Sequence, residues 1–169
     1  CLPPRVMTVF PRGTRLVVLL SAMLVGAVAQ AQSQAHDAHH SATNAEVAAV
    51  VQAMRALFAA AERGDLTALD SLYAGDSLLV IEGAGLNRGW VDYRENHLAP
   101  ELKEFRNFRY RPFEIEARVS GTLAWATYRY ALAADVPDRK VDVVGRGTAI
   151  LERRGDRWVV RLTQTAGRA

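Results

Sequence analysis

The chain has 169 residues, of which 50% are hydrophobic and 23% are charged, and it contains one cysteine. This composition excludes a mainly disordered chain, because disordered chains lack the apolar residues that fill a core. A single cysteine excludes an intrachain disulfide framework. The length is typical of one domain.

The N-terminal segment has the pattern of a secretion signal. Arg12 and Arg15 precede an almost unbroken apolar run from Leu16 to Ala29, and Ala29-Gln30-Ala31 supplies small residues for cleavage. We expect translation to start at Met7 and cleavage to follow Ala31, so that residues 1–31 comprise the signal peptide and its upstream residues. A membrane anchor is the alternative, but the run is shorter than the ~20 residues that span a bilayer.

The predicted leader accounts for the basic character of the chain. Removing Arg5, Arg12 and Arg15 from the 21 basic residues leaves 18, against 18 acidic residues. A neutral domain argues against a nucleic-acid partner. We expect a periplasmic or secreted protein that has no membrane attachment after cleavage.

Residues 32–43 are small and polar and should form a flexible tether, because they bury no apolar surface. The tether carries His36, His39 and His40. Three imidazoles without preformed geometry would bind a metal adventitiously, and we expect neither a functional metal site nor a cofactor.

Helices are predicted to begin the domain. Thr43 and Glu46 have the spacing of a capping box, and apolar residues then recur with helical period, so residues 46–62 should form an amphipathic helix. Gly64 should end it, because glycine tolerates the left-handed conformation of a helix stop. Asp65 is expected to cap a second, short helix with inward-facing apolar residues at Leu66, Leu69, Leu72 and Tyr73.

The remaining elements follow from apolar runs and turn residues. Residues 77–82 should form a strand and 90–98 a third helix, with a kink or restart at Pro100. Four strands are expected at about 105–119, 122–134, 140–153 and 157–165. On the last of them Trp158, Val160 and Leu162 alternate, so we expect all three to face the helices. The order predicts an α+β domain over 44–166, with three N-terminal helices packed on one face of a strongly curved antiparallel sheet.

Three stretches carry a resemblance to a known fold. They are Ala61–Asp65 running into Leu72–Asp76, then Asn87-Arg88-Gly89-Trp90, then Arg154–Val160. With the order of elements, they resemble the SnoaL-like, cone-shaped domains of the nuclear transport factor 2-like superfamily over about 46–165. That superfamily includes isomerases, dehydratases, epoxide hydrolases and proteins that only bind or assemble, so the resemblance implies the fold without the chemistry.

The steroid isomerases of the superfamily permit a comparison of individual residues. Aligned on Gly64-Asp65, their general base falls at Ile81, their oxyanion tyrosine at Leu57 and their second oxyanion acid near Gly147. None of these side chains can exchange the required proton, so that mechanism does not carry over. Glu82 adjoins the base position, but one step along a strand should turn it to the opposite face. Related members often end their last strand with histidines, which residues 161–165 lack.

The third predicted helix carries the first site hypothesis. Trp90, Tyr93, His97 and Glu101 would share one face of a regular helix, and the resemblance implies that this helix borders the mouth of the cone. We consider His97 and Glu82 the candidate catalytic residues and Trp90 and Tyr93 candidate ligand contacts. The alternative is that the aromatics pack in the core while His97 lies at its edge. His97 and Glu101 also have metal-ligand spacing, but two ligands are too few for a closed site.

The strands add three candidate ligand-binding residues. Tyr128 and Tyr130 share one face of their strand, where they suit either an apolar pocket or the core. Arg146 could bind an anionic group or pair with a neighbouring glutamate. Gly145 and Gly147 flank it and are interpreted as marking a bend or bulge in the sheet.

The run from Phe105 to Arg111 alternates basic and aromatic residues, a pattern also found in single-strand nucleic-acid binders. In a neutral domain we interpret it as an edge or interface strand.

Two functions stay open. The first is an exported domain that binds a small, largely apolar molecule with a polar group, and whose chemistry, if any, is cofactor-free proton transfer or hydration. The alternative is a non-catalytic homodimeric module, which a filled cone would favour over a cavity containing His97 or Glu82.

Overall fold

The computed structural model describes residues 44–168. The predicted signal peptide, the tether and Thr43 of the predicted capping box lie outside the described residues. Within 44–168, no helix combines the length and the apolar character needed to cross a membrane.

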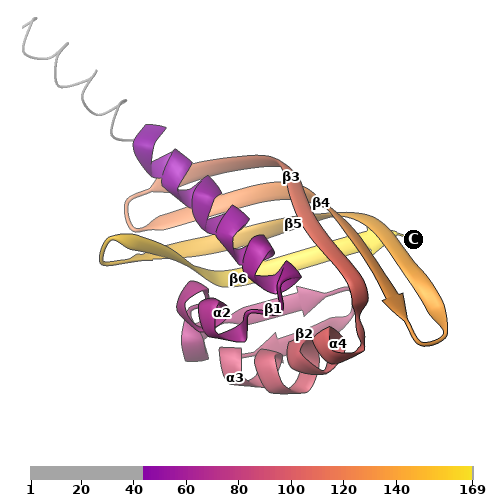
Figure 1. The fold of residues 1–169 in the computed structure, drawn as a ribbon. Helices are drawn as coiled ribbons and strands as arrows, with labels where there is room; N and C mark the ends of the chain where they lie inside the picture. Colours follow the sequence, from indigo (N-terminus) through magenta and orange to yellow (C-terminus); the bar gives the residue numbers. More distant parts are fainter. Residues whose placement is uncertain (1–43, 169) are drawn as a thin grey trace, which may run out of the picture. The chain divides into compact units, whose positions relative to one another are not determined.

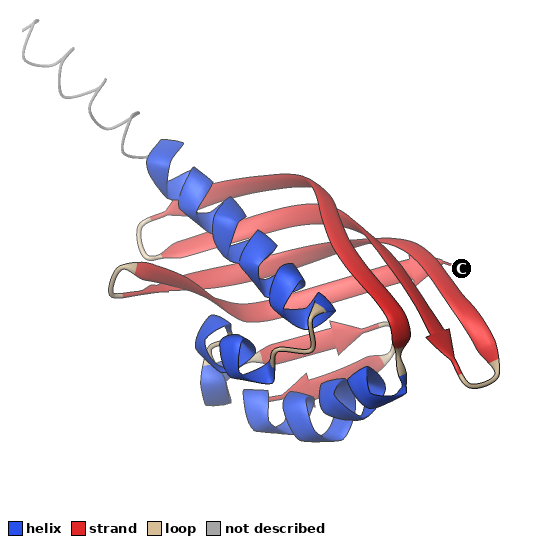
Figure 2. Ribbon diagram, in the orientation of Figure 1, coloured by secondary structure: helices blue, strands red, loops and turns tan. Residues whose placement is uncertain are grey.

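Helices come first and strands dominate the second half, as predicted (Figures 1 and 2). A long N-terminal helix covers residues 44–62. The elements that follow are α2 (Leu66–Leu72), η1 (Gly75–Ser77), β1 (Leu79–Glu82), β2 (Gly85–Arg88), α3 (Trp90–Tyr93), η2 (Arg94–Leu98), α4 (Ala99–Glu104), β3 (Arg106–Ser120), β4 (Leu123–Val136), β5 (Arg139–Arg154) and β6 (Arg157–Arg168).

The six strands form one sheet in the order β2-β1-β6-β5-β4-β3. Strands β3 to β6 form an antiparallel meander, and the sheet bends around the long helix (Figure 1). The prediction of a wholly antiparallel sheet was wrong in one pairing, because β1 runs parallel to β6. Parallel neighbours need a long connection, and here almost the whole chain from β1 to β6 supplies it. The arginine-rich strand β3 is an edge strand, as expected.

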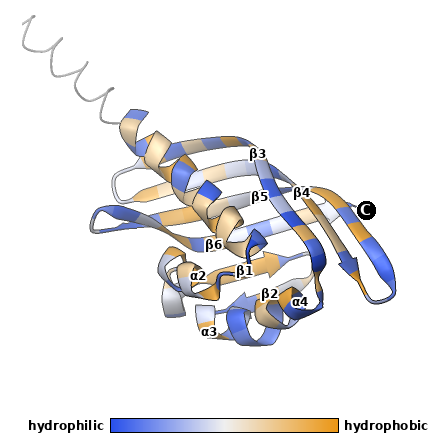
Figure 3. Cartoon of the chain, in the orientation of Figure 1, coloured by the Kyte–Doolittle hydropathy of each residue, from blue (hydrophilic) through white to orange (hydrophobic). Residues whose placement is uncertain are grey.

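The long helix buries the predicted apolar stripe against the sheet (Figure 3). Val50, Met54 and Phe58 are almost completely buried, because positions three or four apart lie on one face of a helix. Gly64 ends the helix with a φ of 66°. Asp65 caps α2 by accepting a hydrogen bond of 2.9 Å from the Ala68 amide. The predicted helix stop at Gly64 and the predicted helix cap at Asp65 are both confirmed.

The third helix is longer than predicted and irregular. It runs as α3, a π-helical segment η2 and α4, with Pro100 in the first turn of α4. Proline has no amide hydrogen to donate to a preceding carbonyl, so the helix restarts where proline is tolerated. Strand β2 lies between the predicted strand and the third predicted helix and was not predicted from the sequence.

A bulge in β6 determines which of its side chains face the helices. Pairing with β5 shifts between Ile150 and Leu151, so Trp158 and Val160 face the core as predicted, while Leu162 lies opposite Ile150 on the other face. The assignment of Leu162 to the core face was therefore wrong. A bulge adds one residue and inverts the alternation beyond it, which turns Thr163 inward.

The paired glycines of β5 make room for tyrosine rings. Gly145 lies opposite Tyr130, and Gly147 lies opposite Tyr128. A Cβ atom at Gly145 would lie only 2.3 Å from the Tyr130 ring, and one at Gly147 only 2.4 Å from the Tyr128 ring. The glycines are therefore explained by ring packing across the strands and not only by a bend.

This packing predicts a stability effect. Gly147→Ala should destabilise the domain by about 1–3 kcal/mol, because the added methyl group overpacks the Tyr128 ring. Chemical denaturation of wild type and variant would measure the change. Thr148→Ala, on the exposed face of the same strand, should change stability by less than about 0.5 kcal/mol. Equal costs at the two positions would contradict the packing argument.

Candidate functional site

The helices and the concave face of the sheet enclose a cavity of about 80 Å³. This is several times the space that one water molecule needs. The cavity adjoins an open mouth of about 830 Å³ between α4, the end of β1 and the β4–β5 hairpin. Six residues line both spaces and form what we name the neck: Glu82, Glu101, Phe105, Tyr110, Leu132 and Thr165.

Glu82 is the carboxylate at the centre of the site. The expectation that Glu82 faces away from the interior was wrong. Val80 is buried in the core, and Glu82, two residues further along β1, projects to the same side. Its Oε1 accepts a hydrogen bond of 3.1 Å from the Tyr93 hydroxyl. Its Oε2 lies 3.0 Å from Nε2 of His97.

His97 supports the carboxylate from outside the cavity wall. Its Nδ1 lies 2.9 Å from Oδ1 of Asn87. Asn87 donates through Nδ2 to Asp92 over 3.1 Å, which fixes the orientation of the Asn87 amide because a carboxylate only accepts. Hydrogen bonds from Asn96, Arg88 and Asn87 hold the pKa of Asp92 below its ordinary value, so Asp92 stays charged.

This chain of contacts determines where the protons lie. Since Asn87 presents an oxygen, the facing Nδ1 of His97 carries a hydrogen. The contact between Nε2 and Glu82 then requires one further proton, held either by the imidazole or by the carboxylic acid. Glu82 and His97 thus form a dyad that shares a proton.

Glu101 extends the dyad. Its Oε1 lies 3.4 Å from His97 Nε2, one helical turn away on α4. Burial raises the pKa of Glu101, with a further contribution from Glu82, while His97 opposes the change. Among residues 44–168, no set of three acidic, histidine or cysteine residues is arranged to hold a metal ion.

All five tyrosines of the chain surround this site. Four line the cavity, and Tyr130 lines the mouth. Burial raises the pKa of Tyr128 to about 12 and that of the other four above the ordinary value. The negative charge of Glu82 contributes in every case. The phenols therefore remain protonated at neutral pH.

The hydroxyl groups differ in their partners. Tyr93 donates to Glu82, and the Tyr128 hydroxyl lies 3.0 Å from Oγ1 of Thr163. The hydroxyls of Tyr73 and Tyr110 have no hydrogen-bond partner among the described residues, although both side chains line the cavity. Tyr73 is only 6% exposed.

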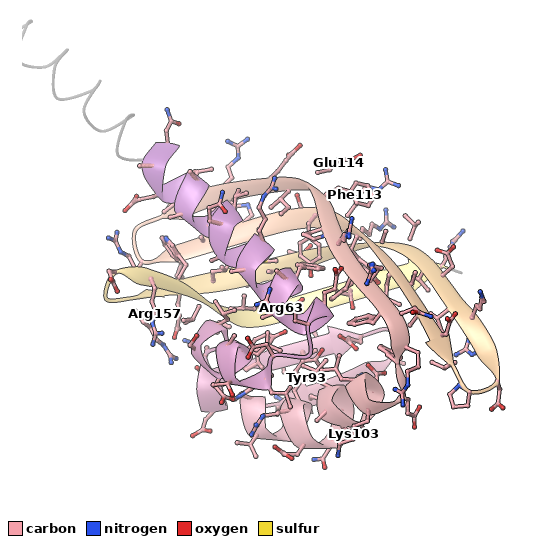
Figure 4. The ribbon with its side chains drawn as sticks, viewed as in Figure 1. Arg63, Tyr93, Lys103, Phe113, Glu114 and Arg157 are labelled. Carbon is pink, nitrogen blue, oxygen red and sulfur yellow. The ribbon has the colours of Figure 1, made fainter. Side chains whose placement is uncertain are left out.

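Five of the predicted site residues lie at the site. Glu82, Tyr93 and Tyr128 line the cavity, Tyr130 lines the mouth, and His97 contacts Glu82 from outside the cavity wall. Trp90 is a packing residue, since it stacks on Tyr73 with ring centroids 4.7 Å apart and donates from Nε1 to Asp70. Tyr93 is labelled in Figure 4, where it lies between the short helices and the sheet.

Arg146 is not part of the site. It alternates with the inward-facing Gly145 and Gly147, so it lies on the outer face of the sheet beside Arg129. Two shallow, open grooves of about 620 and 450 Å³ occupy that face. Phe113 and Glu114, labelled on β3 in Figure 4, belong to the same edge of the sheet. Arg146 lines both grooves and does not line the cavity, so its contact with an anionic group stays a prediction, placed on the outer face.

Tyr73, Tyr110 and Thr163 were missed as site residues. Tyr73 and Tyr110 appeared only as packing or surface-strand residues in the sequence pattern. Thr163 faces inward only because of the bulge in β6, which the sequence does not signal. One available signal was that the tyrosines fall on inward-facing positions of four separate elements.

A helical layer on a curved sheet that encloses a carboxylate-containing cavity defines a cone-shaped α+β domain. The sequence model of the SnoaL-like domain matches residues 50–164. The chain therefore belongs to the SnoaL-like domain family. No protein of curated function matches the chain in sequence.

Solved structures show the same fold at low sequence identity. A candidate dehydratase of the nuclear transport factor 2-like family from Streptomyces avermitilis aligns with a TM-score of 0.67 and 18% identity, over 75% of this chain and 98% of its own. A nuclear transport factor 2-like superfamily protein from Salmonella enterica aligns with a TM-score of 0.65 and 17% identity, over 71% of this chain and 89% of its own. A candidate ketosteroid isomerase from Shewanella frigidimarina aligns with a TM-score of 0.60 and 17% identity, over 68% of this chain and 92% of its own.

Proposed function

We propose that this domain binds a small, largely apolar molecule in the cone and performs cofactor-free proton transfer on it, with Glu82 as the base. The observation that carries the proposal is the carboxylate of Glu82, which lines an apolar cavity and is held at both oxygens by Tyr93 and His97. A carboxylate held in this way presents an oriented oxygen to a molecule in the cavity and can remove a proton from a bound carbon acid.

The supporting groups suit this chemistry. Tyr93 and His97 fix the direction of the carboxylate, so that a substrate in the cavity meets an oriented oxygen. With the shared proton on His97 Nε2, 3.0 Å from Oε2, Glu82 is a carboxylate and can accept a proton from the substrate. The reactions of a dehydratase and of a ketosteroid isomerase, the candidate activities of two structural relatives, can both begin with removal of a proton from carbon; the dehydration then also breaks a C–O bond and releases water.

The cellular setting forms part of the same proposal. The leader-like pattern of residues 1–31 supports export to the periplasm or the medium. The outer face of the sheet supports a homodimer, because it exposes large apolar side chains on neighbouring strands. They are Phe113, Leu123, Trp125, Val144 and Ile150. A non-catalytic homodimeric module is the second candidate function, and the exposed face alone would suffice for it.

Turnover of 5-nitrobenzisoxazole tests the proposed base. In this reaction a base removes the ring C–H proton, the released electron pair forms a nitrile, and the N–O bond breaks to give a coloured phenolate. We expect the wild-type protein to catalyse the reaction and Glu82→Gln to be slower by about a hundredfold or more, which is the usual contribution of a positioned base. Absorbance of the phenolate measures the rate.

Glu114→Gln is the matched control, because it removes the same charge on β3, outside the cavity and the neck. It should retain the wild-type rate. Circular dichroism should show that Glu82→Gln and Glu114→Gln are both folded. If the wild-type protein is then no faster than Glu82→Gln, the proposed chemistry is overturned and the non-catalytic module is favoured.

A further inference from the structure

The neck of the cavity has an unbalanced charge. Glu82 and Glu101 line it, and Glu104 and Asp138 lie at the mouth outside it. Of the residues that the structure describes, no lysine or arginine lines the cavity or its neck, and Arg139 is the single arginine at the mouth. An anionic ligand would meet these carboxylates without a compensating cation, so such ligands are disfavoured.

His97 does not neutralise the neck. It faces Glu82 and Glu101 with one nitrogen, Nε2, at 3.0 and 3.4 Å. One imidazolium charge can therefore balance only one of the two carboxylates. The Glu101 side chain is 48% exposed, so its carboxylate is open to a cation that enters the neck from the mouth.

Aromatic rings cover the rest of the interior. Rings from the long helix, from α3 and from β3 and β4 line the cavity: Phe58, Tyr73, Tyr93, Phe105, Phe108, Tyr110 and Tyr128. Ring faces attract cations through their quadrupole, and cages of such rings beside carboxylates bind alkylammonium groups.

The unpartnered Tyr73 hydroxyl independently points to a ligand. Tyr73 is 6% exposed and lines the cavity, and its hydroxyl has no hydrogen-bond partner among the described residues. The hydroxyl is not sealed off by protein atoms, because Arg94 Nε is the one buried side-chain nitrogen or oxygen without a partner in residues 44–168. A ligand whose polar group reaches Tyr73 would therefore find a hydroxyl free to hydrogen-bond.

We propose that the natural ligand is a cationic amine, with its alkylammonium group held in the neck between Glu82 and Glu101. Its apolar part lies among the aromatic rings, and Tyr73 contacts a polar atom at the inner end. This inference rests on the cavity of the proposed function and specifies the class of molecule that enters it. A positive charge close to the reacting carbon also makes that carbon more acidic, which suits a carboxylate base.

A matched pair of probes tests the charge directly. (4-Hydroxyphenyl)trimethylammonium and 4-tert-butylphenol have nearly the same shape and differ mainly in the central nitrogen or carbon atom. Isothermal titration calorimetry should show that the cation binds about tenfold more tightly, the ratio expected from a cation–π and carboxylate contribution of ~1.4 kcal/mol. Glu101→Gln should reduce the preference to about twofold and leave the neutral phenol unaffected.

Glu114→Gln controls for the loss of one acidic charge at a distance and should keep the tenfold preference. Equal affinity for the two probes, binding of neither probe, or equal effects of Glu101→Gln and Glu114→Gln would each overturn the inference. Because binding is measured, the result does not depend on benzisoxazole turnover. The base hypothesis can fail while the cation preference holds, and the converse is also possible.

Discussion

His97→Ala is expected to lower the rate of benzisoxazole turnover by about a hundredfold, within the range for a group that handles a proton in the transition state. Without the imidazole, Oε2 of Glu82 loses its contact at 3.0 Å, so the carboxylate can rotate away from the cavity. The thermal midpoint should change little, because the His97 side chain is partly exposed and does not belong to the apolar core. Steady-state kinetics and calorimetry measure the two quantities.

His97→Gln separates the role of the shared proton from that of hydrogen bonding. Glutamine can still donate a hydrogen bond to Glu82, but it cannot carry the extra proton and positive charge of an imidazolium. A glutamine variant as slow as the alanine variant supports a role for the proton that His97 shares with Glu82. A glutamine variant with nearly wild-type turnover would limit His97 to a hydrogen-bonding role. Retention of full turnover in the alanine variant would remove His97 from the mechanism.

The nitrogen chemical shifts of His97 provide a readout that packing alone would not change. The contact with Asn87 at 2.9 Å places the hydrogen of the neutral ring on Nδ1. In Asn87→Leu, that preference for Nδ1 should disappear while Glu82 remains in place. An unchanged tautomer in the variant would show that Asn87 does not orient the ring.

Local signals in the sequence predicted most of the fold. The helix stop at Gly64 and the cap at Asp65 depend on a few adjacent residues, and both occur where expected. The parallel pairing of β1 with β6 joins Leu79 to Leu162, residues far apart in the chain. Periodicity within a segment cannot predict such a partner, so this pairing was missed.

The site was only partly predictable for the same reason. His97 and Tyr93 were found because they share a helical face, and that spacing survives the π-helical segment. Glu82 was named, but it was assigned to the wrong face by an alignment placed one residue away, and on a strand one residue reverses the direction of a side chain. Tyr110 reaches the cavity from an edge strand whose arginines dominated the sequence pattern.

Phe58→Ala is expected to destabilise the domain by about 3–5 kcal/mol, the usual cost of removing a buried phenylalanine ring. Phe58 is 1% exposed. Its ring centroid lies 4.4 Å from that of Tyr110 and 5.3 Å from that of Tyr128, so the truncation removes support from two cavity walls. Urea denaturation would measure the loss.

Arg55→Ala, on the exposed side of the same helix, is the matched control and should change stability by less than about 0.5 kcal/mol. A cost that small for Phe58→Ala would mean that the long helix does not pack on the sheet through this face.

The Phe58→Ala variant also links stability to recognition. With Phe58 removed, Tyr110 loses its closest ring neighbour, and the cavity gains space that a neutral aromatic can fill. The space gained serves both probes alike, but the cavity loses one of the rings that attract a cation. The cation preference measured with the two probes should therefore decrease, while the carboxylates of the neck are unchanged.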